Sequence, residues 1–154
     1  MRLSPHFTSY EFCCPCCGSL GDGIDPDLLA LLERVRAHFG KPIKINSGYR
    51  CYAHNAEVGG ANPVIDSEGN PLPQSGSHHL RGTAADIVVI GVSPAKVQQH
   101  LAEHIGGLGS ANTFTHVDVP YLPEFDMASL LTVLGGMLGL GGMRSWERIK
   151  GVGK

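Results

Sequence analysis

The run SHHLRGTAAD, Ser77 to Asp86, decides the fold of this 154-residue chain, and a second run, FTHVDV from Phe114 to Val119, completes it. The first run supplies His79 and Asp86, and the second supplies His116. Two imidazoles and one carboxylate form the three-ligand set of a catalytic zinc site, in which water takes the fourth position. Together the two runs predict a zinc site.

The glycine and the strand period indicate how these side chains converge. Gly82 permits a sharp turn, so we expect His79 in a loop and Asp86 at the start of the following strand. In the second run the two-residue period places His116 and Asp118 on one face. We therefore expect His116 to reach the metal while Asp118 orients a neighbouring imidazole or polar group, a role that carboxylates often take beside metal ligands.

Start and stop signals place the remaining elements. Asp25 as N-cap, Pro26 as first helical residue and Gly40 behind the last apolar position predict a helix. The other expected elements are a strand over 42–46, a short helix over 51–58, a loop or small hairpin over 59–76, a strand over 84–90, a helix from Ser93 to about Ile105, a glycine-rich turn over 106–109 and a strand over 114–119. This order predicts a small α+β domain with a mainly antiparallel sheet and flanking helices.

Composition excludes some classes of function. A formal charge of −2 and a pI near 6.4 argue against a nucleic-acid-binding protein, which would normally show a basic face. The N-terminus has no apolar run behind its charge, so we expect synthesis in a cytoplasm without a secretory signal peptide. Three histidines are interpreted as surface residues: His6, His78 and His100.

The C-terminal segment differs from the rest of the chain. Residues 128–143 contain no charge and are dominated by Leu, Gly and Met, and basic residues follow them. The stretch is shorter than the roughly 20 residues that span a bilayer. It is interpreted either as a helix packed on the domain or on another subunit, or as a membrane-associated tail with its basic end on the cytoplasmic side. We expect one domain with the zinc site over 1–124 and an apolar, glycine-rich tail or helix with a basic end over 125–154.

Five cysteines form a second pattern. Cys13, Cys14, Cys16 and Cys17 make two overlapping C-x-x-C pairs, and Cys51 lies next to Arg50. Such dense thiols can bind a structural zinc, form a disulfide with Cys51 or remain free, and the spacing does not decide among these states. A zinc ribbon would need a second, separate C-x-x-C, which the sequence lacks.

The zinc motifs resemble those of the zinc D-alanyl-D-alanine carboxypeptidase and L-alanyl-D-glutamate endopeptidase family, and its small phage- and prophage-encoded members above all. The resemblance rests on His79, Gly82, Ala84 and Asp86 with His116 in an H-V-D-V strand, and it extends to the INSGYRC run from Ile45 to Cys51. It covers roughly residues 7–120. It implies a fold like that of Hedgehog and D-Ala-D-Ala peptidases.

The same resemblance implies roles for individual residues. His79, Asp86 and His116 would hold Zn²⁺. Ser77 and Arg50 would bind substrate, with Arg50 holding a carboxylate of a peptidoglycan stem peptide. A guanidinium fork is suited to this task because it can bind a planar carboxylate through two hydrogen bonds.

The sequence also departs from the family pattern. Members commonly place a general base, or a His or Asp that supports it, a few residues before the last His ligand, but residues 111–113 and Thr115 hold Ala, Asn, Thr and Thr. None of these side chains takes a proton near pH 7. Residues 62–74 resemble an insertion that would bring Asp66 and Glu68 near the site, either as a base or as a solvated hairpin tip.

Three functions follow as hypotheses. The first is a zinc peptidase that cleaves the peptide part of peptidoglycan, in phage lysis or as a wall-degrading part of a virion, acting at the cell wall after release from the cytoplasm. The second is a catalytically weak or inactive structural or binding component of a phage particle, because a base is missing. The third is a lysis accessory tethered to a membrane, or associated with a virion, through residues 128–154.

Overall fold

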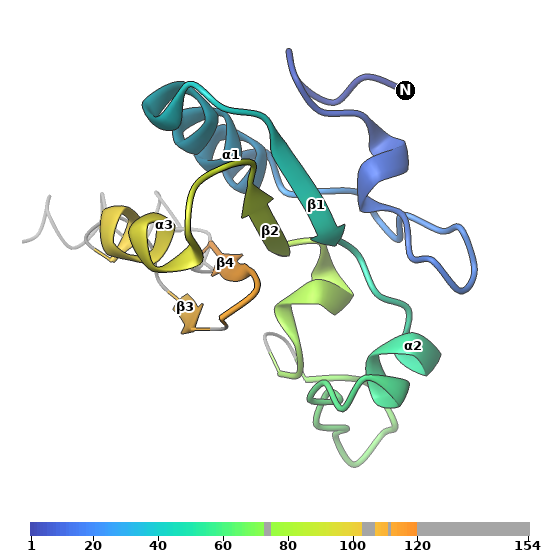
Figure 1. The fold of residues 1–154 in the computed structure, drawn as a ribbon. Coiled ribbons are helices and arrows are strands. Elements are labelled where there is room, and N and C mark those ends of the chain that lie inside the picture. The colour runs from blue at the N-terminus through green and yellow to red at the C-terminus, as the bar shows by residue number, and fades with distance from the viewer. Residues whose placement is uncertain (73–74, 103–106, 111, 120–154) are drawn as a thin grey trace, which may run out of the picture. The chain divides into compact units, whose positions relative to one another are not determined.

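The computed structural model describes residues 1–72, 75–102, 112–119 and the backbone of 107–110 (Figure 1). Its elements are η1 (Ser9–Phe12), α1 (Pro26–Phe39), β1 (Ile43–Ser47), α2 (Tyr52–Glu57), η2 (His78–Arg81), β2 (Ala84–Val89), α3 (Pro94–Leu101), β3 (Gly107–Ser110) and β4 (Thr115–Asp118), where η marks a 3₁₀ helix. The tail expected over 125–154 and the residue Ala111 lie outside the described residues.

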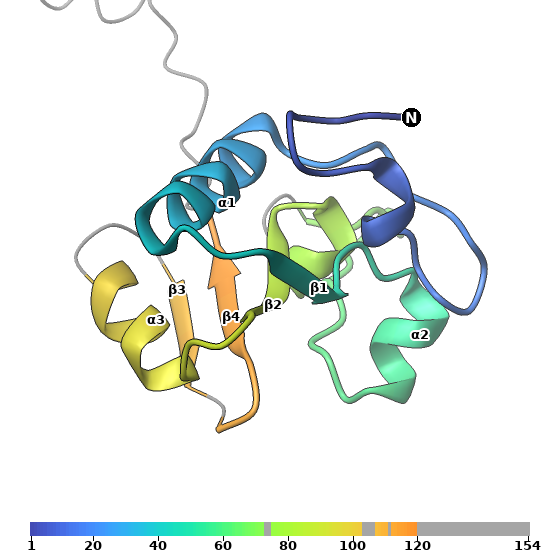
Figure 2. The same cartoon turned by 45° about the horizontal axis from the view of Figure 1, so that its top comes forward.

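The strands form one antiparallel sheet in the order β1-β2-β4-β3. Helix α1 packs on β2, α3 packs on β3 and β4, and α2 lies beside η2 (Figure 2). The expected α+β class with a mainly antiparallel sheet is therefore confirmed. In the described part of the chain, no helix is long and apolar enough to cross a membrane.

Helix α1 begins and ends where its local signals place it. The Asp25 carboxylate accepts a hydrogen bond from the Asp27 backbone N–H at 2.7 Å, which satisfies a donor that the first helical turn leaves unpaired. At the other end Gly40 takes a left-handed conformation and its N–H donates to the Arg36 carbonyl. The buried face of the helix consists of Leu28, Leu31, Leu32 and Val35.

Strand β2 separates the core from the site. Its alternate residues Ala85, Ile87 and Val89 belong to the hydrophobic core, as the two-residue period of a strand requires. The intervening positions, including Asp86, therefore face away from that core. Large core side chains come from the N-terminal segment, α1, α3 and β4: Phe7, Phe12, Leu28, Leu32, Leu101 and Val117.

Three expectations are corrected. Residues 107–109 were expected as part of a turn, but they belong to β3, with Gly107 opposite Asp118. Two glycines and a serine in four residues give no strand signal, and the segment becomes a strand because β4 supplies its hydrogen-bonding partner. Helix α3 ends at Leu101 instead of near Ile105, which lies outside the described residues. His79 lies in η2 and not in a loop.

Candidate metal centre

The sheet register brings the predicted ligands together. On the central strand β2, Asp86 lies directly opposite His116 of β4. His79 belongs to η2, which comes just before β2 in the chain. One nitrogen of each imidazole and one carboxylate oxygen lie within 4.8 Å of one another. The structure thus assembles all three residues that the sequence singled out.

Two of the three distances among the donor atoms fit a zinc ion, and the third is that of a hydrogen bond between His116 and Asp86. His79 Nε2 lies 3.3 Å from His116 Nδ1 and 3.5 Å from Asp86 Oδ1, and His116 Nδ1 lies 2.8 Å from Asp86 Oδ1. A tetrahedral zinc with bonds of about 2.0–2.2 Å needs ligand atoms about 3.3–3.6 Å apart. Two imidazoles and one carboxylate also match the ligand types of zinc sites that leave a position open for water.

His79 is held in the orientation that a metal ligand needs. The residue is 1% exposed, and its Nδ1 donates to the Gly48 carbonyl at 2.6 Å. That bond fixes the proton on Nδ1 and turns the Nε2 lone pair toward His116 and Asp86. Two backbone contacts add to this, since the His79 N–H donates to Ser77 Oγ at 3.3 Å and the Arg50 N–H donates to the His79 carbonyl at 3.1 Å.

Asp86 is buried but remains ionised. Burial would raise the pKa of its carboxyl group, but the hydrogen bond from His116 and the nearby His79 and Arg50 hold that pKa well below its usual range. Arg50 Nη2 donates to Asp86 Oδ2 at 2.5 Å, which leaves Oδ1 to the two imidazoles. A carboxylate with one oxygen neutralised by Arg50 and the other facing two ring nitrogens is arranged as a monodentate metal ligand.

Asp118 lies behind His116. Its Oδ2 is 3.6 Å from His116 Nε2, the ring nitrogen on the opposite side from Asp86. The pKa of His116 is raised, chiefly by its hydrogen bond to Asp86 and further by the charge of Asp118, although burial opposes the shift. The Asp118 carboxylate therefore acts on the His116 imidazole electrostatically, from the side of Nε2.

The two residues predicted to bind substrate lie at the centre, and both have partners within the chain. Arg50 Nε donates to Ser47 Oγ at 2.8 Å, in addition to the contact with Asp86. Ser77 caps η2 through its bond with the His79 N–H. A guanidinium carries five N–H donors, so these two contacts leave donors for a ligand. Substrate binding by Arg50 and Ser77 stays a prediction.

The acidic residues of the insertion take part in a turn. Asp66 Oδ1 accepts from the backbone N–H groups of Glu68 and Asn70 at 2.9 and 2.8 Å. Those bonds lower the pKa of Asp66 although slight desolvation opposes them. Glu68 is exposed, and the hairpin is closed by an isolated bridge between Ile65 and Pro71. This geometry favours the solvated hairpin tip over a general base.

His78 lies closer to the centre than expected. Of the three histidines interpreted as surface residues, His6 is exposed, whereas His78 and His100 are partly buried. Burial lowers the pKa of His78, with Asp118 opposing the shift and Arg81 and His116 adding to it. His78 Nδ1 lies 3.1 Å from Thr83 Oγ1. The sequence pattern gave no sign that His78 lies near Asp118.

Two further contributions were missed because they come from the backbone. The Gly48 carbonyl that orients His79 belongs to the INSGYRC run, but no side chain signals its role. A shift in register between Ile45 and Ser47 pairs Ser47 with Asp86 on the edge strand β1. This bulge places Ser47 opposite Asp86, where Ser47 Oγ accepts a hydrogen bond from Arg50, the residue that contacts the carboxylate. The bulge follows from the pairing of β1 with β2 and has no signal in the sequence of β1 itself.

The described residues also contain a second group of metal-binding side chains. The thiols of Cys14, Cys16, Cys17 and Cys51 lie within 4.8 Å of one another. Cys13 is not part of this group, because its thiol donates to the Ser9 carbonyl at 3.3 Å.

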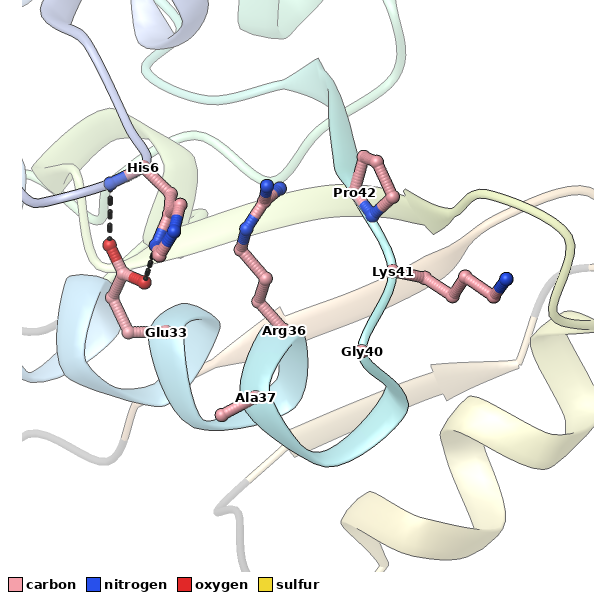
Figure 3. A pocket seen from close by; sticks show the side chains of 7 residues that line it. All are labelled: His6, Glu33, Arg36, Ala37, Gly40, Lys41 and Pro42. Atoms are coloured by element: carbon pink, nitrogen blue, oxygen red, sulfur yellow. Dashed lines mark hydrogen bonds and ion pairs between the residues drawn. The ribbon is translucent and has the colours of Figure 1, made fainter.

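A surface pocket lies away from both groups, between the N-terminal segment and the C-terminal end of α1 (Figure 3). Glu33 binds His6 twice at its edge, through the backbone N–H at 2.9 Å and the ring Nδ1 at 2.7 Å. Arg36, Lys41 and Pro42 complete the wall. None of the residues predicted to act in the metal centre lines this pocket, so it is not assigned to that function.

A small α+β domain with an open His/Asp/His donor set has the features of a metal-dependent hydrolase. Residues 5–118 match the family described as Peptidase M15, and the chain belongs to that family. The family is zinc-dependent, in agreement with the candidate metal-binding groups of this structure. No curated protein and no solved structure matches the chain.

Proposed function

We propose that this protein is a zinc-dependent peptidase that cleaves peptide bonds in the stem peptides of peptidoglycan. The observation that carries the proposal is the triangle of donor atoms from His79, Asp86 and His116, with sides of 2.8, 3.3 and 3.5 Å. Membership of the Peptidase M15 family supports it. A zinc ion bound there would polarise the scissile carbonyl and lower the pKa of a bound water toward neutrality.

Individual groups of the protein have separate roles in this proposal. The Gly48 carbonyl holds the proton of His79 on Nδ1. Asp86 stays ionised because it contacts His116, His79 and Arg50. Asp118, whose Oδ2 lies 3.6 Å from His116 Nε2, would steady the imidazole as a positioning residue. The remaining donors of Arg50 would hold a carboxylate of the stem peptide, and Ser77 would contact the same substrate.

The cellular role extends the proposal. The resemblance to phage- and prophage-encoded members supports a lysis enzyme or a wall-degrading component of a virion, which acts at the cell wall after release from the cytoplasm. Association with a membrane or a virion would involve residues 128–154, which lie outside the described residues.

A second candidate is a catalytically inactive binding or structural component of a phage particle. It is favoured by the lack of an ionisable side chain over 112–115, just before His116. In this case the protein would bind zinc and wall peptides without turnover.

Purified sacculi distinguish the two candidates. We expect the zinc-loaded protein to release soluble peptides or free D-Ala, and a chelator to stop the release. His79→Ala should lose both the zinc of this centre and the activity, because it removes one of three ligands, whereas the exposed His6→Ala should keep both. Zinc uptake and product release are measured on the same samples.

Different outcomes would reject the peptidase and the metal centre. Binding of zinc and of sacculi without product release would reject the peptidase and support the inactive component. Full activity in His79→Ala would reject the metal centre. Mass spectrometry of the released fragments identifies the bond that is cut.

A further inference from the structure

The N-terminal cysteines and Cys51 form a compact cluster of sulfur atoms. Cys16 Sγ lies 3.2 Å from Cys51 Sγ and 3.5 Å from Cys14 Sγ, and Cys14 Sγ lies 3.7 Å from Cys51 Sγ. Cys17 offers a fourth sulfur within 4.8 Å of the others. The cluster joins residues 37 positions apart in the chain.

The backbone around Cys14 is folded to present these sulfurs. The Gly18 N–H donates to the Cys14 carbonyl at 2.8 Å, and the Cys14 N–H donates to the Ser19 carbonyl at 2.8 Å. Gly18 has φ of +69°, a conformation that glycine adopts without strain. The resulting tight turn brings Cys14, Cys16 and Cys17 to one side, where they meet Cys51 at the N-cap of α2.

Backbone N–H donors face two of the four sulfurs. The Cys51 backbone N–H points at Cys14 Sγ at 3.5 Å. A backbone N–H donor also faces the Cys17 sulfur, from Ser19. Such donors stabilise the charged form of a thiol, which is the form that binds metals. Cys14 is fully buried, so its sulfur is enclosed on the protein side of the cluster.

We propose that Cys14, Cys16, Cys17 and Cys51 bind a second, structural metal ion, a thiophilic divalent cation such as Zn²⁺. A tetrahedral Zn²⁺ with Zn–S bonds of about 2.3 Å holds its sulfurs about 3.8 Å apart, which is close to the separations here. Cys14, Cys16 and Cys51 have similar Sγ–Sγ distances, as three sulfurs around one ion would have. No two of them stand apart as a disulfide pair. Four cysteines also close the coordination shell, in contrast to the three-donor centre of His79, Asp86 and His116.

The proposed ion would stabilise the segment that orients His79 and Asp86. Cys51 directly follows Arg50, which contacts Asp86, and the preceding Gly48 carbonyl orients His79. The Tyr49 N–H in turn donates to the Phe12 carbonyl at 2.9 Å, just before the cysteine turn. The ion would thus fasten the N-terminal segment to the 48–51 segment, on which two of the catalytic contacts depend.

Metal analysis of the full chain, purified under reducing and anaerobic conditions, tests the proposal. We expect the wild type to bind one metal ion more than Cys16→Ser or Cys17→Ser, and Cys13→Ser to match the wild type because its thiol lies outside the cluster. His79→Ala should keep the thiolate-bound ion, so a failure of the peptidase proposal is distinguishable from a failure here.

Cobalt substitution of the wild type gives a readout that does not depend on how the variants fold. Tetrahedral Co²⁺ with four thiolates shows intense sulfur-to-cobalt charge-transfer bands in the near ultraviolet and strong visible bands. We expect these bands to persist in His79→Ala. Cobalt spectra without thiolate bands, or an intact mass two hydrogens lighter that reveals a disulfide within the cluster in the protein purified under reducing conditions, would overturn the proposal.

Discussion

At the residue scale, the metal centre depends on side chains whose partners lie on the far side from the donor atoms. His79 is fixed by a backbone carbonyl, Asp86 by Arg50 and His116 by the nearby Asp118. Each donor atom is therefore oriented before any ligand arrives, and orientation of this kind is worth about 10–100-fold in metal affinity.

Asp118→Asn tests the last of these contacts. The variant removes the negative charge behind His116 while keeping the size of the side chain, so we expect zinc affinity to fall by about 10–100-fold with little change in stability. Competition with a zinc chelator measures the affinity. Asp66→Asn carries the same change in a remote turn and should bind zinc like the wild type. Equal affinities for both variants would show that Asp118 has no part in the centre.

At the element scale, η2 presents His79 between two tightly defined ends. Ser77 caps its beginning, and Gly82 closes it with φ of +69°. Gly82 also contacts the segment before α1, since the Asp25 N–H donates to its carbonyl at 3.1 Å. A side chain at this position would meet the Gly23 carbonyl oxygen at 2.1 Å.

Gly82→Ala should therefore lower the free energy of unfolding by more than backbone strain alone would. Gly91 is the matched control because it has φ of +77° but open space around it. We expect Gly91→Ala to lower the free energy of unfolding by about 1–2 kcal/mol, because alanine is strained in the left-handed conformation. Gly82→Ala should lose a further 1–3 kcal/mol or so from the clash and bind zinc more weakly, because His79 shifts. Chemical denaturation measures the difference, and equal losses in the two variants would refute the close packing.

One carboxylate of α1, that of Glu33, binds the N-terminal segment. Glu33 accepts hydrogen bonds from Ser4 Oγ at 2.6 Å and from the backbone and ring of His6. Slight burial would raise the pKa of Glu33, but these bonds hold it below its ordinary value of 4.5. A lowered folded pKa means that the stabilisation is present above pH 4.5 and is lost as the pH falls through the folded pKa.

Glu33→Gln should accordingly be less stable than the wild type at pH 7, by under about 1 kcal/mol because the site is largely solvated. The difference should shrink as the pH falls below the ordinary pKa of Glu33. Denaturation midpoints at neutral and acid pH measure it, with the exposed Glu68→Gln as the control. A difference that stayed constant with pH would mean that the charge of Glu33 contributes nothing.

At the scale of the whole molecule, local signals predicted some parts of the fold and tertiary contacts determined the others. Helix α1 was predictable because Asp25, Pro26 and Gly40 specify its ends locally. Strand β3 was not, because its glycines give no strand signal and only pairing with β4 makes it a strand. Long-range pairing of this kind leaves no pattern within the segment itself.

The same division holds for the metal centre. The convergence of His79, Asp86 and His116 was predictable from residue types, spacing and the resemblance to a known family. The contact of Arg50 with Asp86 depends on the bulge in β1, which the sequence does not signal. The cysteine spacing gave two overlapping C-x-x-C pairs. The tertiary structure determines which of these thiols gather around Cys51.

The pairing of Asp86 with His116 across β2 and β4 also limits how the length of this chain can change. Because strand residues alternate between faces, deletion of one residue between Gly82 and Asp86 would turn the carboxylate into the core and bring Ile87 to the metal. The hairpin around Asp66 has its own hydrogen bonds and can gain or lose residues without moving a ligand. Insertions and deletions should therefore accumulate in that hairpin and be excluded from the strand.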